Sequence, residues 1–106
     1  MKATFVSMVA TAGLVFAGSA LAAEMPAVGK AKCGACHAVE KKVVGPAFEA
    51  VAAKYKGDKD AVSKITANIT KGGAFGWKFG TMPAKGMGAS EADIKTMATF
   101  IVGLAK

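Results

Sequence analysis

Several patterns that identify common classes of protein are missing from this sequence. No run of alternating polar and apolar residues is long enough to predict a β-strand. Beyond residue 23, no apolar stretch approaches the ~20 residues of a membrane-spanning helix. Internal repeats, paired catalytic carboxylates, an activated nucleophile and a phosphate-binding loop are also missing. These gaps predict an all-α protein that is not an enzyme and has no stable insertion in a membrane.

Cysteine and histidine are scarce as well, with two cysteines and one histidine in the chain. All three lie in CGACH, as Cys33, Cys36 and His37. A disulfide between the two cysteines would close a very small loop and add little stability. A tetrahedral zinc site needs four ligands, more than these residues supply. A redox dithiol normally belongs to an α/β pattern, which is missing here.

The first residues have the three parts of a secretory signal peptide. Lys2 gives the positive charge, an apolar run covers about residues 5–17, and the small residues SALAA follow. The pattern predicts a signal peptide over residues 1–23, cleaved after Ala22 or Ala23. An exported, periplasmic protein is expected.

The predicted mature chain, residues 24–106, is short enough to be a single domain. Its formal net charge is +6, because Lys2 is the only charged residue removed from a chain of net charge +7. So short a chain buries only about 60–65% of its unfolded surface and is marginally stable alone. Exported domains of this size usually have an additional support such as a disulfide or a metal.

Four short helices are predicted from apolar periodicity and capping residues. The first runs from Pro26 to about Cys33, the second from Phe48 to Gly57, the third from a cap at Asp58 or Asp60 to Gly72, and the fourth from a capping box at Ser90 to the C-terminus. Between the last two lies the stretch KGGAFGWKFGTMPAKGMGA, which has little predicted secondary structure. A loop this long in a small domain usually has a function.

Covalent haem attachment explains the cysteines and the histidine together. C-x-x-C-H is the signature of c-type haem attachment, in which both thiols bind one porphyrin and the next histidine is an axial ligand of the iron. The sequence therefore predicts one covalently attached haem c, held by Cys33 and Cys36, with His37 as axial ligand. A flat apolar group would also give four short helices a common core.

The second axial ligand is expected to be a methionine, because a thioether suits haem iron. Met97 lies on the apolar stripe of the last helix and is expected in the core. Met25 is too near the attachment motif to reach the other face of the haem. Met82 and Met87 both lie in the long loop. Met82 is favoured because Pro83 stiffens the backbone beside it, but Met87 stays open on these grounds.

The motifs CGACH, VVGPAFEAVAAKY and GWKFGTMPA, followed by an amphipathic helix, resemble a class I c-type cytochrome of the small bacterial cytochrome c-551/c-552 type. The resemblance covers residues 25–106. It implies the cytochrome c fold, with four short helices wrapped around one covalently attached haem. It also implies that His37 and Met82 are the axial pair.

Two further residues are assigned by the resemblance. Pro46 would accept a hydrogen bond from His37 through its backbone carbonyl, and Trp77 would donate its indole N–H to a haem propionate. Phe48 and Tyr55 are expected in the haem pocket. The chain departs from the family at Asn68 and Lys85, where an arginine and an asparagine are frequent, and the loop after Met82 is about two residues longer. These departures affect the expected reduction potential of the haem and the rigidity of the Met82 loop. They do not affect the expected iron ligands.

The predicted function is one-electron transfer, since an iron with two protein ligands has no open position for a substrate. Donors would be a quinol-oxidising complex or a dehydrogenase, and acceptors a terminal oxidase or reductase. The lysines near the attachment and methionine loops favour acidic partner proteins and not nucleic acid; they are Lys32, Lys41, Lys42, Lys78 and Lys85. A haem-bearing subunit of a larger oxidoreductase is the alternative. A sensor or enzyme with a labile Met82 is a third hypothesis.

Overall fold

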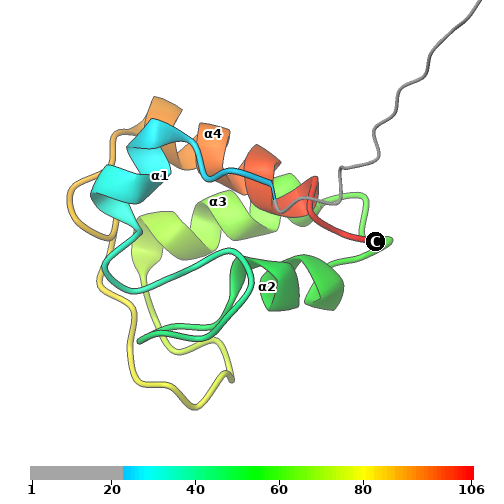
Figure 1. The fold of residues 1–106 in the computed structure, drawn as a ribbon, viewed down its shortest axis with the longest axis horizontal. Helices are drawn as coiled ribbons and strands as arrows, with labels where there is room; N and C mark the ends of the chain where they lie inside the picture. The colour runs from blue at the N-terminus through cyan, green and yellow to red at the C-terminus, as the bar shows by residue number, and fades with distance from the viewer. Residues whose placement is uncertain (1–22) are drawn as a thin grey trace, which may run out of the picture.

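The computed structural model describes residues 23–106, which form four α-helices and no β-strand. The helices are α1 (Ala27–Lys32), α2 (Phe48–Lys54), α3 (Ala61–Lys71) and α4 (Glu91–Val102) (Figure 1). Each prediction of a helix is confirmed, although α2 and α4 end a few residues early. Apart from Ala23, the predicted signal peptide lies outside the described residues.

Helix α4 is the centre of the fold and contacts each of the other three helices. Its buried face consists of Ile94, Met97, Ala98 and Ile101, the stripe expected from the sequence. Ile65 and Ile69 of α3 and Phe48 of α2 join the same core. Met97 is therefore a core residue, as predicted. Within residues 23–106, no helix is long and apolar enough to cross a membrane.

Two long segments without helix, residues 33–47 and 72–90, lie on one side of the helices (Figure 1). Each contains one isolated pair of bridged residues. In the first segment His37 pairs with Lys42, and in the second Gly73 pairs with Met82. The fold thus places the CGACH motif on the same side of the molecule as residues 72–90, which we call the methionine loop.

Short helix α1 lies very close to α4. A Cβ atom built on Gly29 would be 2.6 Å from the sulfur of Met97, so any larger residue there would displace the Met97 side chain. The contact fixes the end of α1, where the N–H of Cys33 donates to the carbonyl of Gly29 at 2.7 Å. Helix α1 is in this way the base from which the CGACH motif extends.

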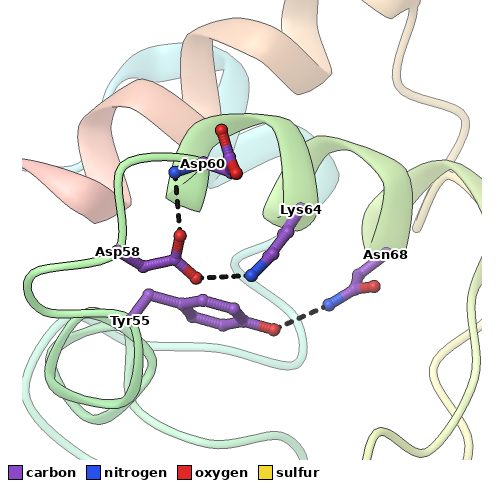
Figure 2. A network of polar contacts seen from close by, with 5 residues as sticks. All are labelled: Tyr55, Asp58, Asp60, Lys64 and Asn68. Atoms are coloured by element: carbon purple, nitrogen blue, oxygen red, sulfur yellow. Dashed lines mark hydrogen bonds and ion pairs between the residues drawn. The ribbon is translucent and has the colours of Figure 1, made fainter.

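The start of α4 has the predicted capping box. The side chain of Ser90 accepts from the N–H of Asp93 at 3.1 Å, and the Asp93 carboxylate accepts from the N–H of Ser90 at 3.2 Å. Helix α3 differs from the prediction, because Asp60 occupies the N-cap position without a side-chain hydrogen bond to the helix. Asp58 instead accepts from the N–H of Asp60 at 2.8 Å and from Nζ of Lys64 at 2.7 Å (Figure 2).

Candidate functional site

The two long segments and the faces of α2, α3 and α4 enclose one large cavity. Its empty space is about 1060 Å³, a figure that includes the open mouth. The walls are mostly apolar. All six residues predicted for the site line the cavity: Cys33, Cys36, His37, Pro46, Trp77 and Met82. Residues far apart in the sequence thus line one cavity.

His37 is held on three sides. Its Nδ1 lies 2.8 Å from the carbonyl oxygen of Pro46, and the only hydrogen-bonding role open to Nδ1 there is to donate. The ring stacks on Phe48 with centroids 4.8 Å apart and planes 17° apart. On another side lies Gly45, where a Cβ would be 2.5 Å from Cε1 of the ring. With the proton on Nδ1, the Nε2 atom keeps a lone pair for a metal.

The two cysteines are partly buried thiols that are not joined to each other. The backbone makes a tight turn between them, with the N–H groups of Cys36 and His37 both donating to the carbonyl of Cys33 at 3.1 and 2.9 Å. Burial raises the pKa of the Cys33 thiol, and the neighbouring Cys36 and Asp93 raise it further. Both cysteines line the cavity, where haem attachment would need them as reduced thiols.

Met82 is fixed by its backbone. Its N–H and carbonyl form two hydrogen bonds with Gly73, each 2.9 Å long. Gly72, with φ of 74°, leaves only enough room for a hydrogen atom, because a Cβ there would be 2.5 Å from the Met82 carbonyl oxygen. Met87 also lies at the cavity, but 61% of its surface is exposed. Of the two methionines in the loop, Met82 is the more enclosed.

Trp77 belongs to a row of side chains that sequence reasoning did not predict. The Trp77 ring stacks on the ring of Phe79, with 6.2 Å between the two centroids. Nζ of Lys54 lies 4.9 Å from the centroid of the Trp77 ring. Nζ of Lys42 lies 4.9 Å from the ring of Phe79. We call these four residues the cation–aromatic row. No sequence signal distinguished Lys54 from the other lysines.

Tyr55 does not line the cavity, in contrast to the prediction, whereas Phe48 does. Tyr55 follows the last residue of α2 and packs against the outside of the core. Its hydroxyl accepts a hydrogen bond of 3.0 Å from the amide of Asn68, which itself lines the cavity (Figure 2). The tyrosine therefore supports a wall residue instead of forming the wall.

The residues present fit a covalently attached haem. The mostly apolar walls of the cavity suit a flat, apolar porphyrin. The two cysteines that such a haem needs for attachment, and the imidazole and thioether that can ligate its iron, all line the same space. In contrast, no group of three or more His, Cys, Asp or Glu side chains within residues 23–106 could hold a metal ion by itself.

Comparison with known proteins gives a consistent result. Residues 17–105 match the family described as Cytochrome c. The chain is 41% identical to cytochrome c-552 of Nitrosomonas europaea over 105 residues, covering 98% of this chain and 99% of that protein. It is 47% identical to cytochrome c-551 of Pseudomonas denitrificans over 76 residues, covering 71% and 90%.

Solved structures agree with the sequence matches. The crystal structure of wild-type Nitrosomonas europaea cytochrome c552 is similar with a TM-score of 0.67 and 40% sequence identity, covering 73% of this chain and 95% of that one. The chain therefore belongs to the cytochrome c family, as a small class I c-type cytochrome of the c-551/c-552 type with one covalently attached haem c, and it is an electron carrier rather than an enzyme.

Proposed function

We propose that the protein is a periplasmic one-electron carrier whose haem is attached through Cys33 and Cys36 and ligated by His37 and Met82. The observation that supports this most strongly is that these four side chains line one apolar cavity. When bound, the haem supplies a one-electron Fe(III)/Fe(II) couple. The periplasmic location is supported by the signal-peptide pattern of residues 1–23.

The chain would keep the two iron ligands in fixed positions. The Pro46 carbonyl accepts from Nδ1 of His37, which would leave Nε2 available to the iron and make the imidazole more electron-rich. The paired hydrogen bonds to Gly73 hold the backbone of Met82. Electron transfer is fast when the ligand geometry changes little between the two oxidation states. Apolar walls that exclude water also favour fast transfer. Trp77 would donate its indole N–H to a haem propionate.

The mouth of the cavity suits an acidic redox partner. Val44, Phe79 and Met87 line the cavity and are also exposed to solvent. Exposed lysines flank them in the sequence: Lys41, Lys42, Lys78 and Lys85. An apolar centre with a cationic rim would be steered to acidic surfaces. We propose a quinol-oxidising complex or dehydrogenase as donor and a terminal oxidase or reductase as acceptor.

A permanent haem-bearing subunit of a larger oxidoreductase is the second candidate, because the same exposed apolar residues could be covered by a partner. The two candidates differ in purification. A carrier is recovered as a separate protein, whereas a subunit co-purifies with its catalytic partner at high salt.

The ligand assignment is tested by visible spectra of the exported, haem-loaded protein. We expect the ferric form to show the weak red-end band of sulfur-to-iron charge transfer. Met82→Ala should abolish this band, and Met87→Ala, the matched control from the same loop, should keep it. A native protein that lacks the band, or binds carbon monoxide readily when reduced, would instead be a sensor or enzyme with an open iron position.

A further inference from the structure

The last residue of α2, Lys54, contacts the methionine loop in two ways. Its Nζ lies 4.9 Å from the centroid of the Trp77 ring, within the range of a cation–π interaction. The same atom donates a hydrogen bond of 3.2 Å to the backbone carbonyl of Phe75. One exposed lysine thus holds two positions of residues 72–90 against α2.

These contacts connect Lys54 to Met82 through two intermediate residues, Phe75 and Gly73. The ring of Phe75 packs on Gly73, because a Cβ built on Gly73 would be 3.2 Å from the Phe75 ring. Gly73 forms the two 2.9 Å hydrogen bonds with Met82. Lys54 therefore holds Phe75, which covers Gly73, which in turn is paired with the proposed iron ligand.

The part of the loop that Lys54 contacts has few other attachments. The later part is tied by backbone bonds from Lys85 to Ile69 and from Met87 to Lys32. In the described chain, residues 74–80 make one backbone hydrogen bond, which is internal, from Trp77 to Ala74. Phe75 and Lys78 have left-handed backbones, with φ of 55° and 65°, which non-glycine residues adopt only when surrounding contacts hold them. Side-chain contacts must therefore hold this part.

We propose that Lys54 is a positioning residue for Met82, which fixes the early part of the methionine loop and so slows the departure of Met82 from the iron. The inference rests on the proposed role of Met82 as axial ligand. Lys42, at the other end of the cation–aromatic row, contacts the loop only through the ring of Phe79. Lys54 contacts it through both the Trp77 ring and the Phe75 carbonyl. Lys54 is therefore the stronger of the two attachments.

The test is hydrogen exchange of the Gly73 and Met82 amides, followed by NMR in the reduced, haem-loaded protein. Lys54→Met keeps much of the side-chain length but removes the charge and the donor. We expect both amides to exchange about two- to ten-fold faster. Imidazole, which competes with Met82 for the ferric iron, should bind more tightly by a similar factor. Lys54→Arg should restore the native values, because it keeps a donor and a cation.

The matched control is Lys56→Met, which changes an exposed lysine two residues along. Lys56 lines a separate surface hollow with Glu49 and Leu104. If Lys54→Met and Lys56→Met have equal effects, or if Lys54→Met accelerates the amides of α3 and α4 as much as those of the loop, the proposal is wrong. Such a result would leave the ligand assignment intact, since that depends on the charge-transfer band and on Met82→Ala.

Discussion

At the scale of single residues, the His37 ring is held by contacts on three sides. A backbone carbonyl, an aromatic ring and a glycine surround it, and each limits a different movement. The glycine is the least obvious of the three. Gly45 does not have a left-handed backbone, so it is needed here for space and not for its conformation.

Gly45→Ala should therefore displace the histidine ring. The added Cβ would be 2.5 Å from Cε1 and 3.0 Å from Nδ1 of His37, so the ring or the turn has to move. Overpacking of this kind costs about 1–3 kcal/mol in the free energy of unfolding. Guanidinium titration of the haem-loaded protein measures it. In the control Gly103→Ala, the nearest atoms are 3.4 and 3.5 Å away and φ is −66°; equal losses in both variants would contradict the packing argument.

The sequence predicts the chemically distinctive residues of this site better than the residues that support them. Cys33, Cys36 and His37 form a motif whose spacing has one common chemical use. Gly45 and Lys54 belong to frequent residue types, and their importance comes from a ring or a carbonyl that folding brings next to them. Contacts between distant segments leave no local pattern, so such residues become visible only in the structure.

At the scale of elements, the starts of α3 and α4 show why one cap was predicted correctly and another was not. Ser90 has an extended backbone, with φ of −76° and ψ of 169°, which directs its side chain to the helix N–H groups. Asp60 has φ of −101° and ψ of 18°, and its side chain does not reach them. Residue type suggests both caps, but backbone conformation decides between them.

The polar network in the turn between α2 and α3 should show in the titration of Asp58 (Figure 2). The Lys64 ammonium, followed by the N–H of Asp60, lowers the pKa of the Asp58 carboxyl below its ordinary value, which is about 3.9 in an unfolded chain. A lowered folded-state pKa means that the contribution to stability is present above about pH 3.9 and is lost as the pH falls through the folded value. Acid should therefore loosen this turn.

Lys64→Met should raise the pKa of Asp58 toward the ordinary value, without reaching it, because the Asp60 N–H still donates. Carbon-13 NMR titration of the Asp58 carboxyl measures the change. The control is Lys59→Met, which removes a nearby exposed lysine. Lys59 is not among the residues that shift the pKa of Asp58. If both variants shift the pKa of Asp58 equally, general electrostatics and not the Lys64 contact is the cause.

At the scale of the whole molecule, the helices are too short to be stable by themselves. They contain 6, 7, 11 and 12 residues, and isolated helices below about 12–15 residues are marginal in water. Several of their buried side chains also line the cavity, namely Phe48, Ile65, Ile69, Met97 and Ile101. The core and the haem site are therefore partly the same set of contacts.

Removal of the haem should consequently unfold most of the chain. In the double variant Cys33→Ala/Cys36→Ala, covalent attachment is impossible and the apolar cavity walls lose their partner. We expect a large loss of the far-UV circular dichroism of helix and no cooperative melting, compared with the haem-loaded protein at the same concentration. A haem-free chain with native helix content and a sharp thermal transition would show that α1–α4 fold independently.

The close contact between Gly29 and Met97 has a consequence for the order of biosynthesis. Helix α1, from which the CGACH motif extends, is supported by α4, and α4 is made from residues 91–102. A growing chain presents Cys33 and His37 long before it contains their support. The attachment motif, near the start of the described residues, is thus supported only when residues 91–102 have been synthesised, so truncated chains would have the motif but no stable site for it.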